Sequence, residues 1–280
     1  MKNSVRNLIF RSMTFILVIT ACSDNSGDDT PPPPGPTSIV YPRTETMPIT
    51  SNFVFDNYTY PVKIFLPETY ATNKNLPIIY ILDGTLNFEK VKNNLDPNIE
   101  AIIVGIGDFA ANEEWQRRFA DFMPGTNCQG AQGKHLDFYN FITKELVPNI
   151  DVKYDNDHNS RSFMGHSAAG IFTLVSMFLE NPENVMFHNF IASDPLLGCD
   201  PDYFAEMLHD YDFSEGAKKF KLYLALSGEG DREGIRQFTE NVNLKGYTWL
   251  TFKYEEFLIK DHMSVVDPSF KSGLKFIFDE

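Results

Sequence analysis

The sequence predicts an α/β fold in which helices cover both faces of a mostly parallel sheet. Continuously apolar runs bounded by turn residues recur along the chain, as expected for strands that are buried on both faces. Segments with helical spacing of their apolar residues lie between these runs, and this alternation indicates parallel strands joined by helices. The chain has 280 residues, of which 42% are hydrophobic, and this is enough for one sizeable core.

The strands are expected where the apolar runs occur, at 59–66, 77–82, 101–105, 162–164, 189–192, 221–226 and 247–252. Helical stripes predict helices over 136–146, 168–179 and 270–277. The region 53–66 is expected to form an antiparallel hairpin at the edge of the sheet. In such a sheet the chemistry belongs on loops that leave the carboxyl ends of strands, so functional residues are sought there.

The N-terminus has the pattern of a secretory signal. A basic segment precedes the apolar run 15–19, which is too short to span a bilayer, and this predicts a signal peptide over 1–21. Ile-Thr-Ala-Cys resembles the lipobox of bacterial lipoproteins, so lipidation is expected at Cys22; a soluble secreted protein is the alternative. Residues 22–39 are polar and proline-rich, which predicts a flexible tether. We therefore expect a domain over 40–280 that is lipid-anchored in the cell envelope, in the periplasm or at the surface.

Charge and motif content exclude several classes of function. A net charge of −14 leaves no basic stripe for phosphates, so nucleic acid is not an expected partner. The sequence has no His-Glu-x-x-His, Cys-x-x-Cys or P-loop, and no metal or nucleotide cofactor is predicted. Cys128 and Cys199 follow predicted strands and are candidates for a disulfide in an oxidising compartment, although two separate thiols fit the sequence equally well.

The stretch FMGHSAAGI, residues 163–171, places Ser167 between a predicted strand and a predicted helix. This context suits a nucleophile elbow, in which a strained turn exposes the serine hydroxyl at a helix N-terminus. The second glycine of the usual Gly-x-Ser-x-Gly pattern is replaced by Ala169, which adds only a methyl group. The alternative is an ordinary serine at the start of a helix.

A nucleophilic serine needs a histidine to accept its proton and a carboxylate to orient that histidine, here in the chain order serine, acid, histidine. His262 follows the last predicted strand and is the histidine in the required position. Asp231 and Glu229 both follow the penultimate strand among glycines and are candidates for the acid. An acidic surface turn that caps the next helix is the alternative for either carboxylate.

An oxyanion hole needs two backbone N–H groups. One is expected from Ala168, directly after the serine, and the second from Gly84 or Thr85, after the strand 77–82. Trp115 and Arg118 lie on a segment that follows another strand, where they are candidates to line the substrate pocket; a segment packed for stability is the alternative.

Several stretches in their order along the chain resemble the putative esterase family of α/β-hydrolases: PIIYILDGTLNF, RSFMGHSAAGIF, FHNFIASDP, LALSGEGD and DHMSVVDPSFKSGLKFIF. The family contains feruloyl and acetylxylan esterases, enterobactin-type siderophore esterases and S-formylglutathione hydrolases. The resemblance covers residues 45 to 279 and implies Ser167 as nucleophile, His262 as base and Asp231 as acid. The chain departs from the family at Ala169 and at Asp194-Pro195, where relatives often have Ser-Pro.

The function expected from the sequence is that of a cofactor-independent serine carboxylic-ester hydrolase acting through an acyl-enzyme. Its predicted location favours acetyl or feruloyl esters of polysaccharides as substrates. A siderophore-ester hydrolase with the same mechanism is the first alternative. A non-catalytic glycan-binding lipoprotein that keeps the fold is the second.

Overall fold

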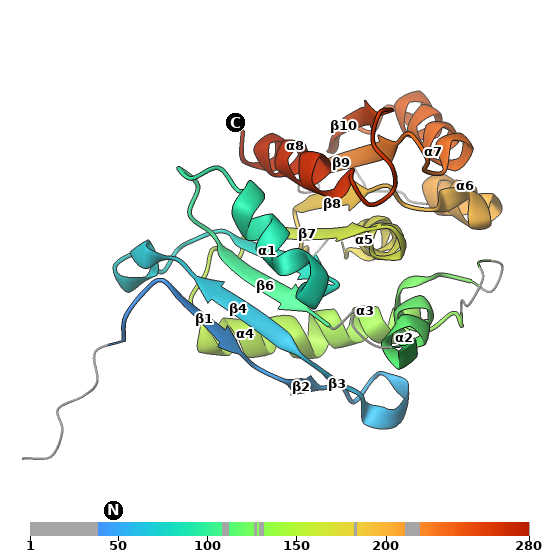
Figure 1. The fold of residues 1–280 in the computed structure, drawn as a ribbon. Coiled ribbons are helices and arrows are strands. Elements are labelled where there is room, and N and C mark those ends of the chain that lie inside the picture. Colours follow the sequence, from blue (N-terminus) through green and yellow to red (C-terminus); the bar gives the residue numbers. More distant parts are fainter. Residues whose placement is uncertain are drawn as a thin grey trace, which may run out of the picture. The chain divides into compact units, whose positions relative to one another are not determined.

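Eight strands form one mostly parallel sheet in the computed structural model (Figure 1). Six neighbouring strands are parallel to one another, whereas both strand pairings at one edge are antiparallel. This confirms the predicted sheet and its antiparallel N-terminal edge. The expected hairpin within 53–66 is wrong, because residues 62–66 pair with residues 43–46 and residues 55–57 form a short 3-10 helix. In spatial order the strands are β1 (Arg43–Thr46), β4 (Val62–Leu66), β6 (Ile102–Ile106), β5 (Ile78–Leu82), β7 (Arg161–His166), β8 (Asn189–Ser193), β9 (Phe220–Ser227) and β10 (Leu250–Phe257).

The structure describes residues 39–107, 112–125, 128, 132–181, 184–210 and 219–279. The predicted signal peptide, Cys22 and the tether up to residue 38 lie outside these ranges. Val40–Glu280 form one compact unit. Within the described ranges, no helix is both long enough and apolar enough to cross a bilayer.

Helices cover both faces of the sheet (Figure 1). One face is covered by α1 (Gly84–Asn94) and α8 (Val266–Phe278), whose buried side chains pack in one apolar cluster. The larger cluster on the other face involves the continuous helical segment α3 (His135–Phe141), η3 (Ile142–Leu146) and α4 (Val147–Lys153), together with α5 (Ala168–Leu179) and α7 (Arg232–Lys245). The remaining elements are α2 (Asn112–Phe122), α6 (Pro201–Asp210), η1 (Phe55–Asn57), η2 (Glu68–Ala71), η4 (Leu197–Cys199), β2 (Ile49–Thr50) and β3 (Thr59–Tyr60).

Two expected strands differ from the structure. The run 59–66 is divided at Pro61, which lacks the N–H that a strand interior requires, so β3 ends before it and β4 begins after it. β10 begins at Leu250 and continues to Phe257, beyond the expected end at residue 252. As an edge strand, β10 is only partly covered and accepts the polar residues that follow its apolar start.

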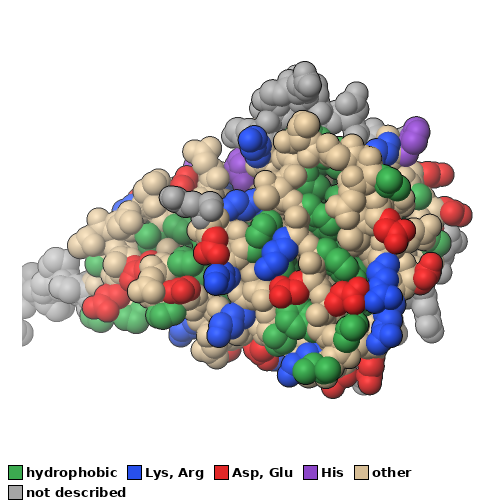
Figure 2. All heavy atoms as spheres, turned by 90° about the horizontal axis from the view of Figure 1, so that it is seen from above, with side chains coloured by type: hydrophobic (Ala, Val, Ile, Leu, Met, Phe, Trp, Pro, Cys, Tyr) green, Lys and Arg blue, Asp and Glu red, His purple; other side chains and the backbone are tan. Residues whose placement is uncertain are grey.

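Charged side chains are distributed without a dominant sign over the face of the molecule shown in Figure 2. Lysine, arginine and carboxylate side chains alternate there with apolar and neutral polar ones. That face therefore offers no extended basic stripe to a polyanion.

Candidate active site

The turn between β7 and α5 holds Ser167 in an unusual backbone conformation. Its φ is 61° and its ψ is −125°, a region that non-glycine residues rarely adopt and that stores strain at functional sites. The Ser167 N–H donates to the Ser193 carbonyl oxygen over 2.9 Å, which fastens the turn to β8. Ser167 is half-buried, whereas both of its neighbours are buried. This strand–turn–helix geometry is the one that presents a serine hydroxyl to a substrate.

Close packing of β7 against α5 explains the small residues around the turn. A Cβ at Gly165 would overlap the backbone carbonyl of Ala169, so only glycine fits at position 165. Ala169 is fully buried, and its methyl group lies beside the space that Gly165 leaves without a side chain. The alanine in place of the usual second glycine is therefore accommodated by the turn.

The N-terminus of α5 offers an oxyanion donor at Ala168. The first N–H groups of a helix have no acceptor within it, and the Ser167 side chain makes no capping hydrogen bond to them. The Ala168 N–H also lies at the positive end of the α5 dipole. Both features suit the stabilisation of negative charge that develops beside Ser167.

His262 lies in the loop between β10 and α8 and reaches the elbow. The centroid of its ring is 4.5 Å from that of His166, the residue before Ser167. His262 Nδ1 donates to Asp194 Oδ2 over 2.6 Å, which leaves Nε2 as the basic nitrogen. Among the described residues no hydrogen bond joins Ser167 to His262, and catalytic hydrogen bonds commonly tighten only when substrate is bound.

The carboxylate that holds His262 is Asp194, and neither expected acid does so. Asp194 follows β8, one strand earlier in the sheet than the expected position after β9. Asp231 instead caps α7, because its carboxylate accepts from the N–H groups of Gly234, over 3.0 Å, and of Gly198. Glu229 is exposed in the same loop. The structure therefore corrects the expected contact between His262 and Asp231.

The Asp194 carboxylate is fully buried and has several donors. Ser227 donates its backbone N–H to Oδ1 and its hydroxyl to Oδ2, each over 2.7 Å. Burial alone would raise the pKa of Asp194, but the hydrogen bonds from His262 and Ser227 hold that pKa below its ordinary value. A Cβ at Gly230 would collide with Asp194, so the glycine-rich loop after β9 closes over this carboxylate. Asp194 is thus ionised at neutral pH and suited to orient His262.

His166, the residue before Ser167, packs its ring against the ring of His262. It is 3% exposed, and its Nδ1 is 3.2 Å from the Ser193 hydroxyl, which is itself 2.6 Å from the Ser269 hydroxyl. Burial, together with the neighbouring His262, lowers the pKa of His166 to about 3. His166 is therefore a neutral packing surface, a role that its position inside the elbow motif did not indicate.

Arg118, which the sequence places as a candidate pocket residue, is buried in an ion pair, and a contact with substrate stays a prediction. Its guanidinium forms a two-pronged ion pair with Asp83, with distances of 2.7 and 2.8 Å, and also donates to the His166 carbonyl oxygen over 3.3 Å. The two side chains are only 5% and 3% exposed. Since Asp83 directly precedes α1 and His166 directly precedes Ser167, this pair fixes the two loops that carry the candidate oxyanion donors.

Gly84 and Thr85 have separate roles at the start of α1. A Cβ at Gly84 would lie 2.6 Å from the backbone of Gly105 and Ile106, so this glycine permits α1 to pack on β6. The Thr85 N–H donates to the Gly107 carbonyl oxygen over 3.3 Å. As the first residue of α1, Gly84 has an N–H without an acceptor inside the helix. Gly84 is therefore the better of the two candidates for the second oxyanion donor.

The other expected residues are placed as follows. Trp115 lies in α2, but its side chain is outside the part that the structure describes. Cys128 and Cys199 form a disulfide with their Cα atoms 4.9 Å apart. The bond joins the segment between α2 and α3 to η4, five residues beyond Asp194.

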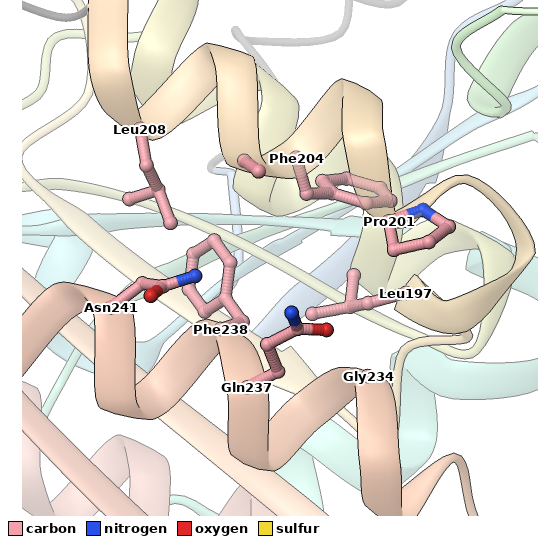
Figure 3. A pocket seen from close by; sticks show the side chains of 9 residues that line it. Leu197, Pro201, Phe204, Leu208, Gly234, Gln237, Phe238 and Asn241 are labelled. Atoms are coloured by element: carbon pink, nitrogen blue, oxygen red, sulfur yellow. The ribbon is translucent and has the colours of Figure 1, made fainter.

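Two further observations concern metal binding and a hollow elsewhere in the fold. Among the residues with described placement, no group of three or more His, Cys, Asp and Glu side chains is arranged to hold a metal ion. Figure 3 shows a hollow between α6 and α7, lined by apolar side chains and by the amides of Gln237 and Asn241. Neither Ser167 nor His262 lines it, so the hollow is separate from the reacting groups.

Comparisons with known proteins find esterases among the relatives of this chain. A family model described as Putative esterase matches residues 57–198. Ferri-bacillibactin esterase BesA of Bacillus subtilis (strain 168) is 26% identical over 254 residues, which cover 79% of this chain and 85% of that protein. Apo-salmochelin esterase of Escherichia coli O6:H1 is 23% identical over 155 residues, or 50% of this chain and 47% of that protein.

The fold has close counterparts among solved structures. The crystal structure of the BES protein from Bacillus cereus superposes with a TM-score of 0.66 at 24% sequence identity, and the match covers 86% of this chain and 97% of that chain. The sheet order, the elbow and this likeness together identify the α/β-hydrolase fold.

Proposed function

The chain belongs to the Putative esterase family and is a serine ester hydrolase, and we propose that Ser167, His262 and Asp194 carry out its chemistry. The observation that carries this assignment is the 2.6 Å hydrogen bond from His262 Nδ1 to the buried carboxylate of Asp194. It fixes the tautomer in which Nε2 can accept a proton. The ring of His262 lies beside the elbow, where that proton comes from the Ser167 hydroxyl.

In the proposed reaction, Ser167 Oγ attacks the ester carbonyl carbon as His262 Nε2 takes the hydroxyl proton. The carbonyl oxygen becomes an oxyanion that accepts from the N–H groups of Ala168 and Gly84. Collapse of this intermediate breaks the bond to the alcohol, which leaves with the proton from His262. Water then attacks the acyl-enzyme by the same steps and releases the acid. Asp194 stays ionised and stabilises the imidazolium.

We propose a siderophore ester as the substrate. The relative that matches over most of its length is a ferri-bacillibactin esterase, and a second relative is an apo-salmochelin esterase. Acyl esters of polysaccharides, which the sequence favoured, have support only from the predicted location of the protein. The siderophore alternative is therefore now the stronger candidate.

The test is direct hydrolysis followed by mass spectrometry. The domain from residue 40 would be incubated with ferri-bacillibactin, with metal-free salmochelin and with a feruloylated and an acetylated oligosaccharide. We expect cleavage of a siderophore ester and none by Ser167→Ala, with a fluorophosphonate adduct mapping to Ser167. Cleavage of only the oligosaccharides would reject the siderophore proposal, and absence of both adduct and cleavage in folded protein would reject the catalytic assignment.

We also propose that the protein is a lipoprotein of the cell envelope, anchored through Cys22. The apolar run, the Ile-Thr-Ala-Cys sequence and the proline-rich tether support this proposal. Metabolic labelling of the full chain in a bacterial host with an alkyne fatty acid would test it. Label that is retained in Cys22→Ala would reject the anchor at this position.

A further inference from the structure

The strand β10 forms one edge of the sheet, and among the described residues no further strand pairs with its outer side (Figure 1). It has eight residues, whereas β1 at the opposite edge has four. Its register with β9 is continuous from Leu250 to Phe257, and the strand contains neither a proline nor a bulge. Natural proteins usually shorten, bend or cover an edge strand. A long regular edge therefore indicates a place where another strand can pair.

The two faces of β10 carry different side chains, because successive residues of a strand point to opposite faces of the sheet. Lys253 and Glu255 lie on the face covered by α8, where both contact the buried Tyr223. Lys253 Nζ is also 3.5 Å from Glu255 Oε2. Glu256 lies on the other face, where it pairs with Arg236 of α7. The α8 face of this edge thus presents a lysine and a glutamate two positions apart.

This charge pattern favours one register for two copies of the edge. A symmetric antiparallel pair has its two-fold axis perpendicular to the sheet, so one residue of β10 lies opposite its own copy. With the axis at Tyr254, Lys253 of each copy lies opposite Glu255 of the other, which gives two pairs of opposite charge. An axis at Lys253 or Glu255 places like charges opposite each other, as does an axis at Glu256. An axis at Phe252 forms no pair of opposite charge.

A groove of about 660 Å³ lies beside β10 on the α8 face. It is lined by Lys221, Thr251, Lys253, Ser272, Lys275, Phe276 and Asp279. Three ammonium groups against one carboxylate make the groove positive, although the whole chain is acidic. With the axis at Tyr254, the partner's Glu255 lies opposite Lys253 and the partner's Phe257 lies opposite Thr251. The groove therefore meets a carboxylate and an aromatic ring, which suit its ammonium groups and its own aromatic ring.

The turn after β10 exposes apolar side chains. Leu258 is 52% exposed and Ile259 is 95% exposed, and removal of such side chains from water drives association. With the axis at Tyr254, this turn lies beside Leu250 at the start of the partner's β10. Pairing of the two strands would therefore cover part of this apolar surface.

We propose that the outer edge of β10 is the interface of a symmetric homodimer, in which β10 pairs antiparallel with β10 of a second copy about an axis at Tyr254. The two eight-stranded sheets then continue into each other. Because the same surface is used by both copies, the contact closes on itself and stops at two chains. The loop with His262 follows β10, so each groove lies beside the segment that leads to the partner's candidate base.

Opposite charge reversals at the two positions test this interface. Lys253→Glu alone places two carboxylates opposite each other at both pairs, and Glu255→Lys alone places two ammonium groups there. For residues 40–280 at about 100 µM we expect a wild-type dimer, and each single variant should have a dissociation constant about tenfold to a hundredfold higher. An equimolar mixture of the two variants restores opposite charges at both pairs, so a heterodimer of nearly wild-type affinity should form. Sedimentation velocity measures these masses.

Lys63→Glu and Glu89→Lys are the matched controls. Lys63 and Glu89 form a surface pair over 2.7 Å on β4 and α1, several strands away from β10. These variants make the same changes in net charge, and each should dimerise like wild type. Far-UV circular dichroism checks that every variant is folded. A monomeric wild type, single β10 variants that dimerise as wild type does, or a mixture that stays monomeric would overturn the proposal.

Cysteine cross-linking tests the register itself, since the two native cysteines of residues 40–280 form a disulfide with each other. In Tyr254→Cys the two new cysteines at the axis have Cα atoms about 4.5–5.5 Å apart, within the range of a disulfide. In Glu256→Cys they lie more than about 13 Å apart. Mild oxidation should therefore give a covalent dimer of Tyr254→Cys and leave Glu256→Cys uncross-linked. Equal cross-linking of the two variants, or cross-linking of neither, would reject the axis at Tyr254.

Discussion

The carboxylate of Asp194 provides the negative charge beside His262 Nδ1. Replacing Asp194 by asparagine keeps the shape of the side chain but removes that charge and allows the wrong tautomer of His262. We expect kcat/KM for 4-nitrophenyl acetate to fall by about 10²- to 10⁴-fold, as for the equivalent change in other serine hydrolases. A variant within threefold of wild type would contradict the assigned role of Asp194.

Asp231→Asn is the matched control for that experiment. Asp231 is the N-cap of α7 and accepts from the N–H groups of Gly234 and Gly198. We expect nearly wild-type kcat/KM, because no contact joins this side chain to His262. The loss in free energy of unfolding in urea should be small, below the roughly 1 kcal/mol that loss of a whole cap costs. A collapse of activity in Asp231→Asn alone would restore Asp231 as the acid.

The buried carboxylate of Asp121 makes the stability of the fold depend on pH. Burial raises its pKa from the ordinary value of 3.8 to about 6, opposed by the hydrogen bond from Tyr60 and the charges of Arg117 and Lys134; the charge of Asp56 raises it further. Between pH 4 and pH 6 the folded state thus holds a proton that the unfolded state has lost. Stability arising from this residue is present below pH 4 and is lost as the pH rises through 6.

Urea unfolding of wild type and Asp121→Asn from pH 4 to pH 7 measures this effect. Relative to the variant, wild type should lose up to about 3 kcal/mol of unfolding free energy across that range. A difference between the two proteins that does not change with pH would show that Asp121 ionises at its ordinary pKa.

At the scale of elements, the Arg118–Asp83 pair joins α2 to the loop before α1 and, through the His166 carbonyl, to the elbow after β7. In Arg118→Met the Asp83 carboxylate would remain buried without its partner. We expect the free energy of unfolding to fall by about 3–5 kcal/mol. Activity should fall chiefly in kcat, because the loops with the oxyanion donors would shift.

Arg236 provides a control with the same fork geometry. It donates two hydrogen bonds of 2.9 Å to the Glu256 carboxylate. Unlike the Arg118–Asp83 pair, this pair lies at the surface, where water screens its charges. Urea unfolding of Arg236→Met should show a much smaller loss than that of Arg118→Met. Equal losses in the two variants would mean that burial does not strengthen the contribution of Arg118.

The sequence predicted the sheet, its antiparallel edge and the strand–turn–helix context of Ser167, because apolar runs and small residues report local packing directly. It placed the acid after the penultimate strand, at Asp231 or Glu229, and missed Asp194, which follows the neighbouring strand in the sheet. The choice depends on a competing partner: the N–H of Gly234 recruits Asp231 as a helix cap. Glycines around Asp231 were a real signal, but Gly230 makes room for Asp194.

The same limit applies to Arg118. An arginine on a segment after a strand looks like a pocket residue, and its buried partner Asp83 lies 35 positions earlier. Pairing over such a separation is set by the tertiary fold and cannot be predicted from the local sequence pattern. The burial of His166 in its neutral form could not be predicted for the same reason. Its partner Ser193, and Ser269 behind that serine, come from other elements.

At the scale of the whole molecule, the disulfide between Cys128 and Cys199 closes a loop that spans 71 positions of sequence. This loop contains β7, Ser167, α5 and Asp194, so the bond encloses two of the three proposed catalytic residues. A cross-link over so long a loop restricts the unfolded chain strongly, with an entropy contribution of about 4 kcal/mol in the chain-entropy model and about 2–4 kcal/mol in typical measurements.

Removal of this cross-link is therefore expected to destabilise the enzyme while leaving its chemistry intact. The double variant Cys128→Ser/Cys199→Ser should lose about 2–4 kcal/mol in urea unfolding. Wild type kept in a thiol reductant should unfold like the variant, because both lack the same bond. Below the unfolding transition kcat should stay within a few-fold of wild type, since Asp194 is held by Ser227 and not by the disulfide. A large fall in kcat in fully folded protein would instead mean that the bond positions the Asp194 loop. Unchanged stability would mean that residual structure already restricts this loop in the unfolded chain.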